Sequence, residues 1–249
     1  MAPPLLPIGT LLTGGSAQQL QYRVLRQLDA AGKVLEAQDT INGRKVCIKA
    51  GSFADTQTEI QVLLTGLHVL MALRGMHQHM GFIHGDIKGE NIVLLPDGRP
   101  VLVDFGATQQ LRNAQNALIP PPPGPPRLYL QTPKYASVRV MQGQREGEGD
   151  DLLALAYLLT ELLGLYPHVQ AGDWHVTVLA AKVNWDAKSD TSLTYPVRRL
   201  FYYGERATYG VSPDYNSILT AFVNRITHLN PNSLFPGTAY PLPIPSFHR

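Results

Sequence analysis

The sequence predicts an α+β fold, with a small β-rich part followed by a larger, mainly helical part. Short strand-like segments occupy its beginning, whereas long apolar segments of helical character dominate its second half. Strands that precede helices along a chain are typical of this fold class. The chain has 249 residues, of which 44% are hydrophobic, so it is long and apolar enough to bury one large core.

Strands are expected first, and each is bounded by residues that favour turns. Asn42-Gly43 separates two strand-like segments, which is a strong short-range signal for a β-hairpin. A second hairpin is expected around Pro96-Asp97-Gly98, because this tripeptide has the composition of a tight turn. The expected strands lie within residues 22–28, 34–40, 44–49 and, on the two sides of the second turn, 91–103.

Helices are expected after the first strands. Residues 152–163, LLALAYLLTELL, are apolar nearly all the way round, so a helix of this composition belongs inside a core and not on its surface. The other expected helices are 58–79, 197–203 and 217–226.

Prolines mark two tails around this folded part. Residues 1–20 are expected to form a proline-containing N-terminal tail and residues 229–249 a proline-rich C-terminal tail, which leaves 21–228 for the domain. The N-terminus has no basic stretch before its apolar residues, so it does not resemble a signal peptide. The longest apolar segment, Leu152–Tyr166, contains Glu161 and is too short to predict a membrane span.

Charge and cysteine content exclude several classes of partner. The net charge is +2 and no dense Lys/Arg run is present, so we expect no nucleic-acid partner. The single cysteine, Cys47, rules out an internal disulfide framework and a cysteine-rich zinc site. We therefore expect an intracellular protein, cytoplasmic or nuclear, without a membrane partner.

The strongest chemical signal lies in His84–Asn91 (HGDIKGEN) and Val103–Gly106 (VDFG). Asp86 is placed to accept the proton of an attacking hydroxyl, and Lys88 to neutralise charge on a transferred phosphoryl group. Asn91 and Asp104 supply the oxygen ligands that Mg²⁺ prefers, and the hairpin between them would bring both to one end of a strand pair. This set indicates phosphoryl transfer with Mg²⁺.

These two motifs resemble the catalytic loop and the magnesium loop of the protein kinase superfamily. Val46-Cys47-Ile48-Lys49 resembles the strand that carries the nucleotide-binding lysine, so Lys49 would bind phosphates. Val34 and Gly32 fall where the glycine-rich loop would have its valine and its last glycine. The resemblance implies a two-lobed protein-kinase-like fold with a reduced β-rich N-lobe at about 21–57 and a mainly helical C-lobe at about 58–228.

Further stretches resemble the casein kinase 1 and vaccinia-related kinase group. They are Thr132–Ser137 (TPKYAS), Asp150-Asp151 before the apolar helix, and Pro213-Asp214-Tyr215. The resemblance implies that Thr132 helps to position the substrate and that Asp151 clamps the catalytic loop. Gly85, which replaces an arginine, is also found in the vaccinia-related branch. Without that arginine we expect no activation by phosphorylation of the activation segment.

The segment between Lys49 and His84 is short for this family. It has room for one helix, so the adenine-binding hinge is expected to be missing. Glu59 is the acidic residue that could pair with Lys49, although a favourable position near a helix N-terminus explains it better.

Three functional interpretations stay open. The first is a casein kinase 1-like serine/threonine kinase that phosphorylates proteins, and the second is a pseudokinase or truncated kinase that acts as a binding scaffold. The third is a small-molecule phosphotransferase, because His-Gly-Asp also occurs in aminoglycoside-kinase-like enzymes; Lys88 and Asp104-Phe105-Gly106 argue against it. Separately, Pro122–Arg127 fits a PxxPxR ligand of an SH3-type partner, although a stiff spacer explains it better.

Overall fold

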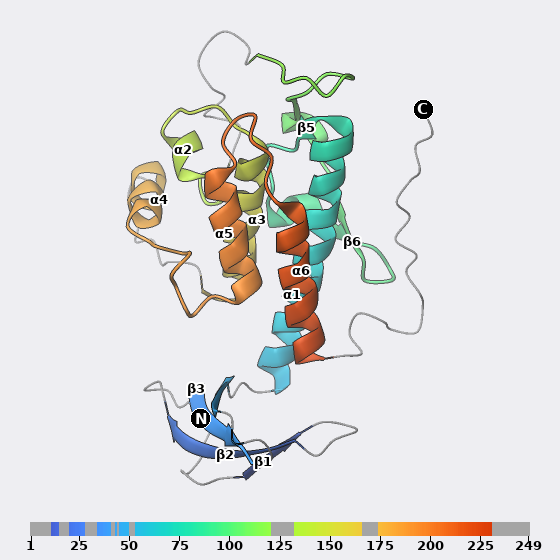
Figure 1. Cartoon of the computed structure of the whole chain (residues 1–249). Coiled ribbons are helices and arrows are strands. Elements are labelled where there is room, and N and C mark those ends of the chain that lie inside the picture. The colour runs from blue at the N-terminus through green and yellow to red at the C-terminus, as the bar shows by residue number, and fades with distance from the viewer. Residues whose placement is uncertain are drawn as a thin grey trace. The chain divides into compact units, whose positions relative to one another are not determined.

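The computed structural model describes residues 11–14, 20–27, 34–40, 43, 45–49, 53–120, 132–165 and 174–230. The chain divides into two compact units, Met1–Gln57 and Thr58–Arg249. The first unit contains the strands β1–β4 and the second contains most of the helices (Figure 1).

The first unit holds a four-stranded antiparallel sheet in the order β1-β2-β3-β4. The strands are β1 (Leu11–Gly14), β2 (Leu20–Gln27), β3 (Val34–Asp39) and β4 (Lys45–Lys49). Gly43 has a positive φ of 72°, as the Asn-Gly hairpin signal before β4 requires. Glu36 on β3 forms ion pairs with Arg26 on β2 and Lys45 on β4, and these neighbouring cations hold the pKa of its carboxyl below the usual value.

Strand β1 lies in a segment that we expected to be part of the N-terminal tail. Leu11–Gly14 pairs antiparallel with β2, in a register that sets Leu11 opposite Arg23 and Gly14 opposite Leu20. Pairing with β2 satisfies the backbone groups on one side of this four-residue edge strand, which is too short for a period-two pattern to reveal it.

One long helix leads into the second unit. Helix α1 (Phe53–Arg74) continues as a π-helical turn (Gly75–Met80), and β5 (Phe82–Ile83) follows. The prediction that a single helix fills the segment between Lys49 and His84 is therefore confirmed for the described residues 53–83.

The core of the second unit surrounds helix α3 (Glu148–Leu162). Leu152, Leu155 and Leu159 are fully buried there, as the all-round apolar sequence predicted. Around α3 pack α1, α5 (Tyr195–Arg206) and α6 (Tyr215–Leu229), and α1 and α6 run side by side (Figure 1). Gly66 permits this close approach, because a Cβ atom there would lie 2.6 Å from Leu159 Cδ1 and 2.8 Å from Phe222.

The helices differ from expectation in two respects. Helix α3 begins at Glu148 and not at residue 152, because the Asp150 carboxylate accepts the Gly147 N–H at 2.7 Å and so stabilises an earlier start. Helix α4 (Trp174–Val183) was missed, since its β-branched Val and Thr residues resemble a strand. The remaining helix, α2 (Val138–Met141), has only four residues.

Two short two-stranded sheets complete the second unit. Strand β5 pairs with β8 (Gln109–Gln110), and β6 (Ile92–Leu94) pairs with β7 (Pro100–Leu102). The expected turn joins β6 to β7, where Gly98 has a φ of 80° and donates its N–H to the Leu95 carbonyl at 2.8 Å. This hairpin connects the two predicted motifs.

One helical stretch in the described part of the chain, Thr56–Met80, is long and apolar enough to cross a membrane. Leu63, Leu70 and Leu73 within it are fully buried in the protein core. Packing in the core thus accounts for its apolar composition without a membrane.

Candidate active site

The loop that follows β5 gathers three of the predicted site residues. Lys88 Nζ lies 2.6 Å from Asp86 Oδ2, and Asn91 Nδ2 donates to the Asp86 carbonyl at 2.8 Å and to Asp86 Oδ2 at 3.2 Å. The hydrogen bond with Asp86 raises the pKa of Lys88, more than its partial burial lowers it. Asp86 is thus held between a cation and an amide, with its side chain 11% exposed.

The β6–β7 hairpin brings the fourth residue to the same place. Val103 N–H donates to the Asn91 carbonyl at 2.9 Å, so Asn91 and Asp104 flank the open end of the hairpin. The charge of Asp104 also contributes to the raised pKa of Lys88. The hairpin geometry predicted for these two residues is therefore present.

Asp104 has an unusual backbone conformation. Its φ of 62° and ψ of 76° lie in the left-handed region, and its Oδ1 accepts the Gly106 N–H at 3.2 Å. Aspartate tolerates this region better than most residues, because its short side chain can bond locally. The carboxylate is exposed and directed by this turn.

The donor set at the hairpin end fits Mg²⁺ and phosphate. Asn91 uses Nδ2 for both of its hydrogen bonds to Asp86, which leaves Oδ1 as the atom to ligate a metal, and Asp104 adds an exposed carboxylate. Mg²⁺ in nucleotide sites takes one or two such oxygen ligands and completes its shell with phosphates and water. Among the described residues no cluster of three His, Cys, Asp or Glu side chains could hold a metal by itself.

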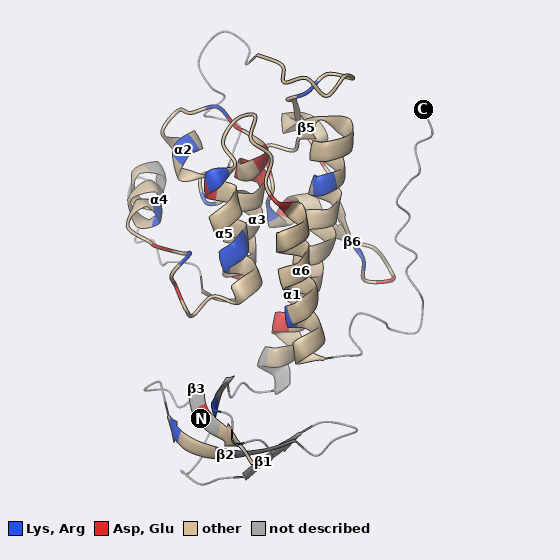
Figure 2. Cartoon of the chain, viewed as in Figure 1, with Lys and Arg blue, Asp and Glu red and all other residues tan. Residues whose placement is uncertain are grey.

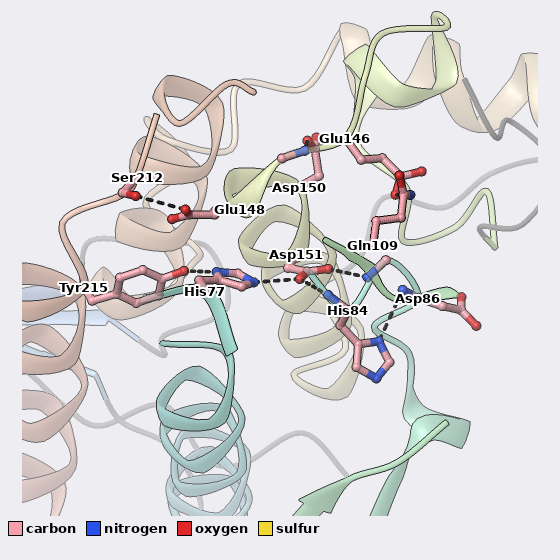
Figure 3. Close-up of polar contacts among 12 residues, drawn as sticks. His77, His84, Asp86, Gln109, Glu146, Glu148, Asp150, Asp151, Ser212 and Tyr215 are labelled. Atoms are coloured by element: carbon pink, nitrogen blue, oxygen red, sulfur yellow. Dashed lines mark hydrogen bonds and ion pairs between the residues drawn. The ribbon is translucent and has the colours of Figure 1, made fainter. Parts of the chain in front are cut away.

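Asp151, near the start of α3, bonds the backbone of the catalytic loop. Its carboxylate accepts the N–H groups of His84 at 2.7 Å and Gly85 at 2.9 Å, and it lies 2.8 Å from His77 Nε2. Burial alone would raise the pKa of Asp151, but the bonds from His77 and the two amides outweigh it and hold the pKa low. The predicted clamp on the catalytic loop is confirmed (Figure 3).

His84 joins the two motifs through its ring. Its Nδ1 accepts the Asp86 N–H at 3.3 Å, and Nε2 lies 3.2 Å from the Val103 carbonyl oxygen. Both contacts are satisfied by the tautomer with the proton on Nε2. Sequence reasoning assigned no role to His84 or His77, and their place within and just before the catalytic-loop motif was the available signal.

The backbone conformation at position 85, where the family has an arginine, favours glycine. Its φ is 80°, and a Cβ atom there would lie 2.8 Å from the Ala107 carbonyl oxygen and 3.4 Å from Glu146 Oε2. Any side chain would therefore be strained and would meet an acidic neighbour. An arginine at this position would thus strain the backbone and displace a neighbour in this conformation.

The described start of the activation segment is bonded to the helical unit without a phosphate. Gln109 Nε2 donates to Glu146 Oε2 at 2.9 Å, Arg112 donates to the Gly210 carbonyl at 3.1 Å, and Tyr209 donates its hydroxyl to the Ile119 carbonyl at 2.7 Å. These contacts hold the described start of the segment, and the expectation that its phosphorylation does not activate the protein stays a prediction.

The TPKYAS stretch forms a turn in front of α2. The Thr132 carbonyl accepts the N–H groups of Tyr135 at 2.9 Å and Ala136 at 3.1 Å. Lys182 of α4 donates to the Pro133 carbonyl at 2.9 Å and to the Ala136 carbonyl at 2.5 Å. Thr132 is half-buried in this turn, and its role toward substrate stays a prediction.

For several predicted site residues, the structure describes neither backbone nor side chain, or the backbone alone. Gly32 and Pro122–Arg127 fall outside the described residues. Val34 on β3 and Lys49 on β4 are directly paired in the sheet register, but their side chains are not among those described.

Glu59 has a partner within the helical unit. Its Oε1 accepts hydrogen bonds from Arg225 of α6, from Nε at 3.0 Å and from Nη2 at 2.8 Å. Figure 2 shows an acidic (red) and a basic (blue) stretch of ribbon at this end of α1 and α6. The ion pair, which joins residues 166 positions apart, explains a glutamate that the sequence suggested was placed for the helix dipole.

Comparisons with known proteins agree with this geometry. Residues 34–233 match the family model described as protein kinase domain. The 3-phosphoinositide-dependent protein kinase 1 of Arabidopsis thaliana is 32% identical over 43% of this chain and 22% of its own length. The B1 kinase of monkeypox virus is 27% identical over 68% of this chain and 59% of its own. The chain thus covers less than two thirds of either relative.

A solved structure shows the same fold. The structure of vaccinia related kinase 3 superposes with a TM-score of 0.59 and 15% identity, over 92% of this chain and 94% of that one. The fold class predicted from the sequence, a protein-kinase-like fold with a reduced β-rich part, is confirmed. With the catalytic and magnesium loops placed by one hairpin and a family match across most of its length, this chain belongs to the protein kinase family.

Proposed function

We propose that the chain is a serine/threonine protein kinase of casein kinase 1-like type, which transfers the γ-phosphoryl group of ATP to a protein hydroxyl. One observation carries this proposal: Lys88 and Asn91 hold Asp86, and the β6–β7 hairpin brings Asp104 beside them. These are the groups that phosphoryl transfer needs for proton acceptance, charge neutralisation and metal binding.

Each residue has a distinct proposed role. The Asp86 carboxylate accepts the proton of the attacking serine or threonine hydroxyl. Lys88, now 2.6 Å from Asp86, stabilises the negative charge that develops on the transferred group. Asn91 Oδ1 and the Asp104 carboxylate would hold Mg²⁺, which neutralises phosphate charge when bound, and Lys49 would bind the phosphates.

The casein kinase 1-like subtype is supported by three stretches outside the two motifs. Asp151 bonds the catalytic loop, and Tyr215, in the Pro213–Tyr215 stretch, contacts the same network through His77. Lys182 bonds the TPKYAS turn through the Pro133 and Ala136 carbonyls, and we assign Thr132 in this turn to substrate positioning on the strength of the resemblance.

The test is transfer of labelled phosphate from Mg-ATP to casein. The wild type should label casein, and Asp104→Ala should reduce labelling to background, because a magnesium ligand is lost. Asp97→Ala is the matched control, since Asp97 lies at the closed end of the same hairpin and bonds Arg99 at the surface. Equal labelling by wild type and Asp104→Ala would contradict the assignment.

A second candidate is a catalytically impaired kinase that acts as a scaffold. The Glu59–Arg225 ion pair favours it, because Glu59 was the residue considered as a partner for Lys49 and it is already bonded elsewhere. A thermal-shift titration with Mg-ATP separates the candidates, since a ligand that binds the native state must raise its melting temperature. No shift and no labelling, together with capture of an SH3 domain that depends on Pro122–Arg127, would favour the scaffold.

A further inference from the structure

A buried chain of polar groups connects helix α6 to the catalytic loop (Figure 3). We propose that Tyr215 is a positioning residue for the catalytic loop, which acts through His77 and Asp151. Its effect on phosphoryl transfer rests on the proposed function, whereas its effect on the loop does not.

Four segments of the protein are joined by this series of hydrogen bonds. The Tyr215 hydroxyl of α6 is hydrogen-bonded to His77 Nδ1 of the π-helical turn. His77 Nε2 lies 2.8 Å from Asp151 Oδ2 of α3, and Asp151 accepts the amide N–H groups of His84 and Gly85. Asp86, the proposed base, follows Gly85 directly.

All four side chains in this series of hydrogen bonds are buried, so the loss of any one bond is costly. The exposed fractions are 2% for Tyr215, 1% for His77, 2% for Asp151 and 0% for His84. Water cannot replace a lost partner at such depth, so an unmade bond leaves a buried polar atom unsatisfied.

Hydrogen-bond directions follow from the chemistry of the four groups. Asp151 is ionised and can only accept, so His77 must donate from Nε2. In a neutral imidazole Nδ1 then accepts, and the Tyr215 hydroxyl is its donor; burial raises the pKa of Tyr215 and keeps that proton in place. Tyr215 therefore supplies the donor for the ring nitrogen of His77 that does not bond Asp151.

A substitution of Tyr215 by phenylalanine separates the effect of its hydroxyl from the effect of its ring packing. The rings of His77 and Tyr215 lie 5.8 Å apart at 62°, an edge contact that phenylalanine would keep. Glu148, whose charge acts on Tyr215, accepts the Ser212 hydroxyl at 3.0 Å through Oε1, and no hydrogen bond joins it to His77 among the described residues. A change from Tyr215 to Phe thus removes one donor and little else.

The experiment measures the loop directly by NMR, in the full chain without nucleotide. In Tyr215→Phe, hydrogen exchange of the His84 and Gly85 amides should accelerate about five- to tenfold, the effect of one lost buried hydrogen bond. The ¹⁵N shifts of His77 should report the Nε2–H tautomer in the wild type, and the Nδ1 shift should change in the variant, where this nitrogen loses its hydrogen-bond donor. Tyr203→Phe is the matched control, because Tyr203 bonds Arg199 at 2.6 Å, away from the catalytic loop.

The outcomes separate this proposal from the proposed function. Exchange and His77 shifts in Tyr215→Phe that equal those of Tyr203→Phe would overturn the positioning role, as would an imidazolium His77 in the wild type. If the wild type transfers phosphate, Tyr215→Phe should lower kcat about tenfold with the KM for ATP unchanged, because no member of the chain binds nucleotide. A wild type without activity would contradict only the proposed function, since the exchange and shift readouts remain.

Discussion

Lys182 offers the sharpest test of how the TPKYAS turn is held. The residue is 5% exposed, and its Nζ donates to the Pro133 carbonyl at 2.9 Å and the Ala136 carbonyl at 2.5 Å, 3.9 Å from the centre of the Tyr157 ring. Burial lowers the pKa of Lys182 from 10.5 to about 6. The folded protein therefore holds this amine neutral at pH 7, while the unfolded chain holds it charged.

As a consequence, the contribution of Lys182 to the free energy of unfolding should rise with pH. Between pH 6 and pH 10.5 the unfolded state binds one more proton at Lys182 than the folded state does, so raising the pH favours folding. The slope is about 1.4 kcal/mol per pH unit, so Lys182 should add about 2.7 kcal/mol to the free energy of unfolding between pH 7 and pH 9. Below pH 6 both states are protonated and the slope vanishes.

Lys182→Met isolates this contribution, because methionine keeps the length of the stem without the amine. Urea unfolding of both proteins at pH 7, 8 and 9 gives the difference in their free energies of unfolding. We expect the wild type to gain on the variant by about 2.7 kcal/mol over this range, whatever constant offset the lost hydrogen bonds cause. A difference that stays flat with pH would refute the reasoning and show that the carbonyls and the Tyr157 ring keep Lys182 charged.

Two further substitutions test the loop and the helix pair. Gly85→Arg should lower the free energy of unfolding by roughly 1–3 kcal/mol, because φ is 80° and a Cβ would lie 2.8 Å from the Ala107 carbonyl oxygen. It should not make activity depend on phosphorylation, and a stable variant activated by an upstream kinase would contradict this. Arg225→Ala should lower the free energy of unfolding by about 2 kcal/mol, since it leaves the Glu59 carboxylate, whose side chain is 11% exposed, without its cation. Adding Glu59→Gln should recover part of that loss in urea unfolding, and no recovery would argue against the ion pair.

The sequence predicted those parts of the site that are local in the chain. Asp86, Lys88 and Asn91 lie within six residues, and a turn between two short strands was enough to predict that Asp104 joins them. The apolar helix around Leu155 was predicted correctly as the centre of the core, since its composition allows no exposed face.

Contacts that depend on packing between distant segments could not be predicted in the same way. The pair of Glu59 with Arg225 and the contact of His77 with Tyr215 join residues 166 and 138 positions apart. Their partners are set by how α1 and α6 pack, which hydrophobic periodicity does not specify. The buried amine of Lys182 was missed for a related reason, because lysine is almost never fully buried and its sequence neighbours give no sign of burial.

Helix α6 is bonded at both ends to the segment that enters the catalytic loop. Arg225 holds the start of α1 through Glu59, and Tyr215 holds the π-helical turn through His77. Asp151, which accepts the His84 and Gly85 amides, also belongs to the unit that begins at Thr58. The short segment after Lys49, which we expect to lack the adenine-binding hinge, supplies none of the bonds that hold Asp86. A loss of activity in this chain should consequently appear in nucleotide binding, with the amide protection of His84 and Gly85 retained.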